Sequence, residues 1–145
     1  MKVSTKGRYA LRIMIDLAEN YGERYIPLKD ISERQDITVK YLEQIVSLLS
    51  KAELVISSRG NNGGYRLAKK PSEYKILEIF RAAEGDFEPS PCSSENGCER
   101  RGCKAAVFWQ GLERTVRDYM NGQTLEDVVK NSRASASRDP SIWIL

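Results

Sequence analysis

A glycine-rich turn between two short β-branched segments constrains the fold more than any other feature of the sequence. The segment Leu54–Arg59 precedes the turn Gly60–Gly64, and Tyr65–Leu67 follows it. Glycine and asparagine tolerate the positive φ angles that tight turns require, and the flanking residues favour strands. The pattern therefore predicts a β-hairpin over residues 54–67.

Three helical patterns precede this hairpin. Apolar residues recur at three- and four-residue steps over Thr5–Asn20, and shorter helices are expected over Leu28–Gln35 and Val39–Lys51, the last with Thr38 as its N-cap. Helix, turn, helix and hairpin follow one another in the order of a winged helix-turn-helix domain. In such domains one helix enters the major groove of DNA, and the wing reaches the backbone or the minor groove.

The next part of the sequence combines one more helix with a segment that shows no periodicity. The helix expected over Ile76–Ala83 ends at Gly85. The segment Asp86–Cys103 contains proline, serine, glycine and asparagine. We expect it to be an ordered loop only if it binds something.

A long helix expected over Lys104–Asn121 carries more apolar residues than one small domain needs, which favours a dimer formed between two such helices. A short helix around Leu125–Val129 follows it. The predicted fold is mainly α with a small β-hairpin wing. Its expected parts are a winged helix-turn-helix domain over 1–84, a cysteine loop over 85–103, the dimerisation helix and short helix over 104–130, and a loose tail over 131–145.

The charged residues are distributed unevenly along the chain. The net charge is +3, and residues 1–70 contain 13 Lys and Arg against 8 Asp and Glu, so the basic excess lies in the predicted DNA-binding domain. This is compatible with contact to a polyanion, although solvated surfaces show similar imbalances. No apolar run approaches the roughly 20 residues that span a bilayer, and Met1–Lys6 is not followed by the apolar segment of a secretion signal. We therefore expect a cytoplasmic protein without membrane contact.

Two groups of polar residues are candidates for DNA contact, at the start of the third helix and in the wing. Glutamine can bind adenine, glutamate can accept from the amino group of cytosine, and lysine can bind guanine or phosphate. The wing turn lacks the GxxxxGK[ST] pattern and joins strand to strand, so nucleotide binding is the weaker alternative, and a merely solvated surface is another. The predicted contacts are Lys40, Tyr41, Glu43, Gln44, Arg59, Gly60, Asn61, Asn62 and Arg66.

Three cysteines, Cys92, Cys98 and Cys103, lie in one short polar segment, and the chain has no histidine. An odd, clustered set in a protein without an export signal argues against a disulfide framework. Thiolates grouped in one loop favour an iron–sulfur cluster or zinc. Zinc is the weaker alternative, because structural zinc sites use close ligand pairs and four protein ligands. A thiol redox switch, or no role, also stays open.

Several short motifs spread over nearly the whole chain match a known family. They are Ser4–Ala10, Ile31–Gln35, Tyr41–Gln44, Arg59-Gly60, Gly63–Tyr65, the three-cysteine loop and Thr124-Leu125. With them the chain resembles the IscR-like winged-helix regulators. The resemblance implies a homodimer formed through the long helix, an operator of dyad symmetry, and control of genes for cluster assembly or sulfur metabolism. It also implies that Glu43 helps to discriminate between operators according to cluster state.

Two positions depart from the pattern of this family. Relatives with a [2Fe–2S] cluster have a histidine ligand where this sequence has Ala106. Nitric-oxide-sensing relatives with a [4Fe–4S] cluster have an aspartate where it has Arg8. We expect a [2Fe–2S] rather than a [4Fe–4S] cluster, whose fourth ligand is a nearby carboxylate, a small exogenous thiol or water.

The preferred interpretation is a repressor whose DNA binding depends on the iron–sulfur cluster. A repressor that senses nitric oxide or redox state is an alternative within the same class. An iron–sulfur carrier or electron-transfer protein is the alternative from another class, but such a protein has no need of a basic helix-turn-helix with a wing. An enzyme is not expected, because a cysteine nucleophile would find no histidine to act as its base.

Overall fold

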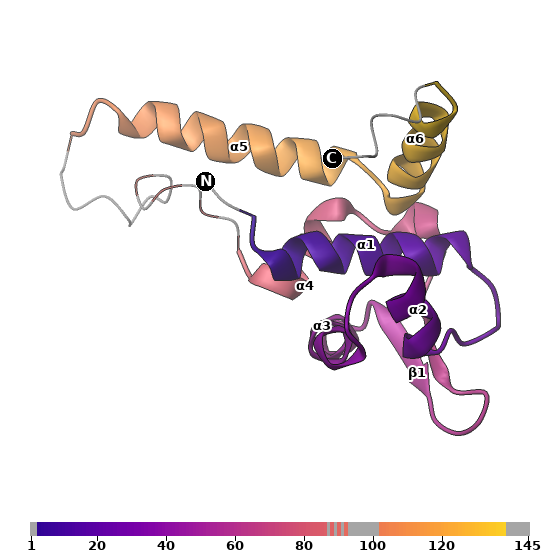
Figure 1. The fold of residues 1–145 in the computed structure, drawn as a ribbon. Helices are drawn as coiled ribbons and strands as arrows, with labels where there is room; N and C mark the ends of the chain where they lie inside the picture. The colour runs from indigo at the N-terminus through magenta and orange to yellow at the C-terminus, as the bar shows by residue number, and fades with distance from the viewer. Residues whose placement is uncertain (1–2, 87, 89, 91, 93–101, 139–145) are drawn as a thin grey trace.

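The computed structural model describes residues 3–86, 88, 90, 92 and 102–138 (Figure 1). Its elements are α1 (Thr5–Glu19), α2 (Leu28–Gln35), α3 (Val39–Lys51), β1 (Val55–Ser58), β2 (Gly64–Leu67), the 3-10 helix η1 (Pro71–Glu73), α4 (Ile76–Glu84), α5 (Ala106–Gly122) and α6 (Leu125–Arg138). The two strands form one antiparallel sheet. The predicted fold, mainly α with a hairpin wing, is confirmed.

Helix α1 lies at the centre of the core. It contacts α2, α3, α4, α6 and β2, and its inward residues Ala10, Ile13, Met14 and Leu17 are at most 1% exposed. Truncating such a buried aliphatic side chain to alanine costs about 2–5 kcal/mol. We use the name head for residues 3–84, which assemble around this helix.

Two local features set the helix-turn-helix. Helix α2 ends where Asp36 adopts a left-handed backbone conformation with a φ of 53°, which turns the chain sharply. Thr38 then accepts a hydrogen bond from the N–H of Tyr41 at 3.3 Å and caps α3. The bounds predicted for α2 and α3 are confirmed, as is the predicted cap.

The wing is an antiparallel hairpin in which Val55 lies opposite Leu67. It projects from the side of the head opposite to α5 (Figure 1). Gly64 has a φ of 153°, and a Cβ atom at this position would collide with the carbonyl group of Ile26. The close approach lets Ile26 and Tyr65 exchange two backbone hydrogen bonds of 2.8 and 2.9 Å. The chain before α2 is thereby attached to the edge of the wing.

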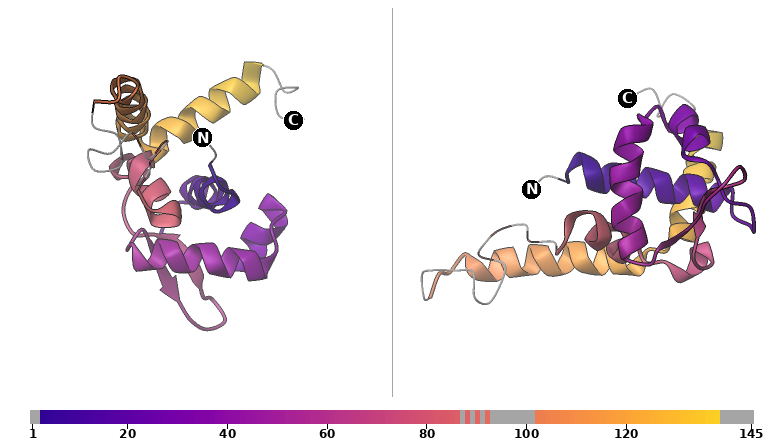
Figure 2. Two further views of the ribbon diagram at one scale, coloured as in Figure 1. Left: turned by 90° about the vertical axis from the view of Figure 1, so that its left-hand side faces the viewer. Right: turned by 90° about the horizontal axis from the view of Figure 1, so that it is seen from below.

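Helix α5 differs from the other long helices because none of its residues is buried. It lies along α4 and extends well beyond the head (Figure 2). Its bounds agree with the predicted long helix to within two residues. None of the helices in the described part of the chain is long and apolar enough to cross a membrane.

Helix α6 is longer than the sequence predicts. A short helix ending near Val129 was expected, with a loose tail after it, but the helix continues to Arg138. No glycine or proline interrupts it, and the alanines at 134 and 136 favour a helix. Leu125 and Val129 are buried, and α6 packs against α1 and η1. The last helix therefore contributes to the core of the head.

Candidate nucleic-acid interface and cysteine site

The outer face of α3 carries the side chains expected to contact DNA. Lys40, Glu43 and Gln44 are exposed, whereas the opposite stripe of the helix is buried. Tyr41 is half-buried, and its ring meets that of Tyr9 edge-on with 5.6 Å between the centroids. Three of the four predicted residues are thus exposed to solvent, while Tyr41 packs α3 against α1.

A buried carboxylate holds the helix-turn-helix on α1. The side chain of Asp16 is 3% exposed, and it accepts hydrogen bonds of 2.9 and 2.7 Å from Arg34 and one of 2.9 Å from Gln35. Gln35 in turn accepts hydrogen bonds from Arg12 with its side-chain and main-chain oxygens. The hydrogen bond to Asp16 raises the pKa of Arg34, so the guanidinium stays charged. Bidentate pairs have a narrow geometry, and this one fixes α2, and with it α3, relative to α1.

The tip of the wing exposes a second group of predicted contacts. Arg59, Gly60, Asn61 and Asn62 are all exposed. Gly60 has a φ of 103°, and its carbonyl accepts a hydrogen bond of 3.0 Å from the N–H of Gly63, which closes the turn. An arginine beside such a projecting turn can enter a narrow minor groove or bind phosphate.

Arg66 is placed differently from Arg59. Its guanidinium lies 4.7 Å from the centroid of the Tyr25 ring and donates a hydrogen bond of 2.9 Å to the carbonyl of Glu23. Arg66 therefore joins the wing to the chain before α2. The sequence did not reveal this contact, because the two segments are about 40 residues apart along the chain.

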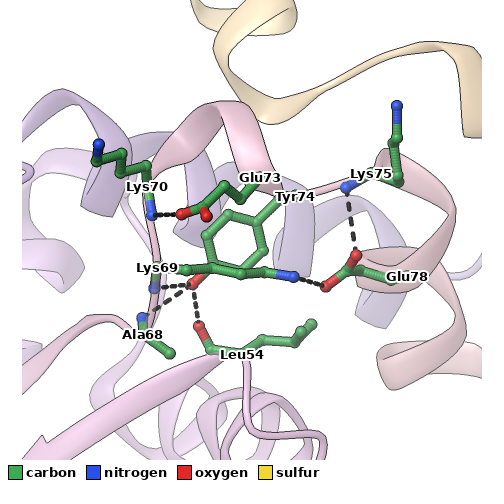
Figure 3. Close-up of polar contacts among 8 residues, drawn as sticks. All are labelled: Leu54, Ala68, Lys69, Lys70, Glu73, Tyr74, Lys75 and Glu78. Carbon is green, nitrogen blue, oxygen red and sulfur yellow. Dashed lines mark hydrogen bonds and ion pairs between the residues drawn. The ribbon is translucent and has the colours of Figure 1, made fainter.

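Sequence reasoning also missed Tyr74, which lies between the wing and α4. Its side chain is fully buried, and its hydroxyl bonds to the main chain at both ends of the hairpin (Figure 3). Burial raises the pKa of this phenol, which therefore remains a protonated donor. A tyrosine among apolar residues looks like any other core aromatic in a sequence, and only the fold shows its polar role.

The described residues include two of the three predicted cluster ligands, while Cys98 lies outside them. Cys92 and Cys103 are half-buried, and neither is in a disulfide. The carbonyl of Cys103 accepts a hydrogen bond of 3.2 Å from the N–H of Ala106, the first residue of α5.

Thiolates are the usual ligands of an iron–sulfur cluster, and Cys92 and Cys103 are two such thiols. The side chain of Ala106 has no donor atom, so it cannot replace a histidine ligand. Within the described residues, no three His, Cys, Asp or Glu side chains come together as a metal site.

Glu84, the last residue of α4, connects the start of the cysteine segment with α1. Its Oε1 accepts a hydrogen bond of 3.1 Å from the N–H of Gly7 and another from the hydroxyl of Ser4. A Cβ atom at Gly7 would collide with this carboxylate. Arg8 follows on the exposed side of α1 and donates to the hydroxyl of Thr5 at 3.3 Å. The position that holds an aspartate in some relatives therefore presents a cation here.

The polar face of α3 and the projecting hairpin define a winged helix-turn-helix regulator of transcription. The family model of Rrf2, described as an iron-dependent transcriptional regulator, matches residues 3–131. The chain therefore belongs to the Rrf2 family of transcriptional regulators. The resemblance on which the sequence prediction rested is confirmed.

Individual relatives agree with this assignment. The transcriptional regulator IscR of Aliivibrio salmonicida is 36% identical over 140 residues, which are 96% of this chain and 83% of the relative. The structure of CymR, the global cysteine regulator of B. subtilis, has a TM-score of 0.77 at 37% identity and covers 90% of this chain and 98% of its own. The T. potens IscR structure has a TM-score of 0.76 at 36% identity, with coverages of 91% and 88%. All three are named as regulators and none as an enzyme, which agrees with the prediction.

Proposed function

We propose that this regulator is a dimeric repressor of an operator with dyad symmetry, and that an iron–sulfur cluster on Cys92, Cys98 and Cys103 controls its DNA binding. One observation carries the DNA-binding part of the proposal. The exposed side chains of Lys40, Glu43 and Gln44 on α3 belong to the same head from which the wing projects with Arg59 at its tip. A helix and wing arranged in this way can read a major groove and the neighbouring backbone together.

Each exposed group has a distinct task on DNA. Gln44 can form paired hydrogen bonds with adenine, and Glu43 can accept from the amino group of cytosine. Lys40 and Arg59 supply positive charge for phosphates or the minor groove. Because these contacts release counterions, binding should weaken steeply as the salt concentration rises.

The dimer is proposed from the surface of α5. Val107, Phe108 and Tyr119 are 75%, 66% and 70% exposed, and at about 100° per residue the half-buried Leu112 and Val116 share one side of the helix with Phe108 and Tyr119. Apolar side chains on such a helix need a partner surface. With its 17 residues, α5 is about 25 Å long.

The cluster is proposed from the three cysteines of the segment between α4 and α5. When bound, an iron–sulfur cluster supplies a redox-active, oxygen-sensitive crosslink between its thiolates. Cys103 lies beside the N-terminus of α5, and Glu84 at the end of α4 holds the N-terminus of α1. Three cysteines leave one ligand position for a carboxylate, a small thiol or water. We favour a [2Fe–2S] cluster with regulation of cluster-assembly or sulfur-metabolism genes.

Substitutions on the DNA face test the first part of this proposal. Gln44→Ala and Arg59→Ala should each lose about 1–3 kcal/mol of binding free energy on a selected operator, and Lys40→Ala should weaken binding to all sequences about equally. The operator can be a duplex that the wild-type chain selects from a random-sequence pool, with binding followed by electrophoretic mobility shift. Equally small losses on random DNA for all three variants would mean that the recognition surface lies elsewhere.

Replacing the three cysteines with alanine tests the second part. The protein prepared without oxygen should be coloured, and it should differ from the triple variant in operator affinity or sequence preference. Equal binding of the two to every operator would exclude control by the cluster. A colourless protein that contains zinc would show that the cofactor is zinc rather than an iron–sulfur cluster. The proposed DNA contacts of α3 and the wing would not be affected by that result.

A further inference from the structure

The base of the wing is organised by a single hydroxyl group. Tyr74 Oη accepts hydrogen bonds from the N–H groups of Ala68 at 2.8 Å and Lys69 at 3.1 Å, and it donates one of 2.6 Å to the carbonyl of Leu54 (Figure 3). Leu54 comes directly before β1, and Ala68 and Lys69 come directly after β2. A hydroxyl has one donor and two acceptor positions, and all of them are used here.

This hydroxyl is inserted into the last rung of the hairpin. The N–H of Ala68 also points to the carbonyl of Leu54, but at 3.3 Å, which is longer than its distance of 2.8 Å to the hydroxyl. At their base the strands are therefore joined both by this backbone bond and by the side chain of Tyr74, which makes the shorter contacts. The orientation of the wing consequently depends on where this side chain is anchored.

The main chain of Tyr74 is anchored to the helices of the second half. Its carbonyl accepts a hydrogen bond of 3.1 Å from the N–H of Leu125, and the N–H of Ile76 donates one of 3.0 Å to the carbonyl of Gln123. These two bonds attach the α5–α6 corner to the chain on either side of Lys75. Tyr74 thus touches the wing with its hydroxyl and the first residue of α6 with its backbone.

A lysine covers the tyrosine ring from outside. The ammonium group of Lys69 lies 4.8 Å from the ring centroid and forms an ion pair of 2.8 Å with Glu78 on α4. Glu78 also accepts a hydrogen bond of 3.3 Å from the N–H of Lys75 at the start of α4. The base of the wing is thereby held from α4 as well.

We propose that Tyr74 is the positioning residue of the wing, which sets the angle at which Arg59 meets DNA. This inference rests on the proposed contact of Arg59 with DNA. Strands of four residues are about 13 Å long, so a tilt of about 10° at the base moves the tip by about 2 Å. Such a displacement breaks a hydrogen bond, whose length varies by only a few tenths of an ångström.

A double-mutant cycle on the full-length chain tests this role. Tyr74→Phe should weaken binding to the selected operator by about 5- to 10-fold, and the loss should shrink to less than about 2-fold when Arg59 is already alanine. In a Gln44→Ala background the loss should stay undiminished, because that side chain belongs to α3. Tyr21→Phe, which removes the hydroxyl of a half-exposed tyrosine, is the matched control and should leave affinity unchanged.

Stability is measured in parallel, so that a loss of folded protein is not mistaken for a loss of binding. If Tyr74→Phe does not remain folded at the assay temperature, Glu78→Gln carries the test, since it removes the ion pair of Lys69 at a partly exposed position. Its loss should be about 2- to 3-fold and should likewise vanish in the Arg59→Ala background.

Two results would overturn the inference in different ways. Equal losses from Tyr74→Phe in the presence and absence of Arg59 would show that the tyrosine does not act through the wing, and the proposed DNA face would stand. No loss from Arg59→Ala alone would remove the wing contact, and the role of Tyr74 would fall with it.

Discussion

The head buries its apolar side chains and pairs its buried charge within the chain, whereas α5 leaves its apolar side chains exposed. In the head, α1 buries its inward stripe almost completely, and the one buried carboxylate, Asp16, has its partners within the same chain. In α5, no residue is buried, and Val107, Phe108 and Tyr119 are mostly exposed. The head is therefore complete within one chain, whereas α5 leaves large apolar side chains exposed, which the proposed dimer would cover.

The largest effect is expected at the buried carboxylate. Asp16→Asn removes the charge that pairs with Arg34 and should lower the free energy of unfolding by about 2–4 kcal/mol. Glu113→Gln breaks the ion pair with Arg117 one turn away on α5 and should cost no more than about 0.5 kcal/mol. Urea unfolding followed by circular dichroism measures both. If Asp16→Asn and Glu113→Gln lowered the unfolding free energy by similar amounts, the contrast between the head and α5 would be contradicted.

A charge in the apolar stripe of α5 should strongly affect association of the subunits but hardly change the stability of one chain. Leu112→Asp should raise the dimer dissociation constant about 30- to 100-fold, because it places a charge in the apolar surface proposed to join the subunits. The unfolding free energy of the dilute monomer should change by less than about 0.5 kcal/mol. Sedimentation velocity over a concentration series measures the association.

The control for Leu112→Asp lies on the other side of the same helix. Arg114 is exposed and lies about 200° around the helix from Leu112, so Arg114→Asp should leave association unchanged. A wild-type protein that is monomeric at micromolar concentration would refute the proposed use of α5 altogether.

A smaller effect is expected at the N-cap of α6. Thr124 Oγ1 accepts a hydrogen bond of 3.0 Å from the N–H of Asp127, and Asp127 accepts one of 3.0 Å from the N–H of Thr124. Thr124→Ala should lower the unfolding free energy by about 1 kcal/mol. Thr115→Ala on α5 is the matched change and should have an effect within about 0.5 kcal/mol. Both are compared in the Leu112→Asp background, so that dimer contacts do not contribute.

The smallest effect concerns acid sensitivity at the same cap. The hydrogen bond from the backbone of Thr124 lowers the pKa of Asp127 below its ordinary value of 3.8. The stabilisation is therefore present above that value and is lost as the pH falls through the lower pKa of the folded state. The melting temperature of Asp127→Asn should be lower than that of the wild type near neutral pH, and the difference in melting temperature should disappear in strong acid. Asp118→Asn on α5 should melt in parallel with the wild type at every pH, and a constant difference for Asp127→Asn would contradict the prediction.

Patterns confined to neighbouring residues were the ones that the sequence predicted well. The bounds of α2 and α3 follow from Thr38 and from helical periodicity, whereas the left-handed turn at Asp36 is seen only in the structure. The exposure of Gln44 follows from the same periodicity, because a residue on the polar face of an amphipathic helix points away from the core.

Contacts between distant segments could not be predicted in this way. Arg34 donates hydrogen bonds to Asp16, which lies 18 residues earlier in the chain. Arg66 contacts the Tyr25 ring only because the wing folds back on the chain before α2. The role of Tyr74 depends on three backbone groups that meet only in the folded hairpin. The length of α6 was underestimated because a serine-rich composition suggested a loose tail, although alanines and the lack of glycine or proline sustain the helix.

The packing of α6 on α1 has a consequence for how the chain is synthesised. A ribosome synthesises the N-terminal segments first, but the core around α1 cannot be fully packed until Leu125 and Val129 have been synthesised. The roughly 40 residues between α4 and α6 take about 2–8 s to make at about 5–20 residues per second. During that interval the nascent chain already carries α3 and the wing, while one apolar side of α1 still faces water. In this interval the exposed apolar side of α1 is available to a chaperone that binds apolar segments. Folding is completed only once the last helix has left the exit tunnel.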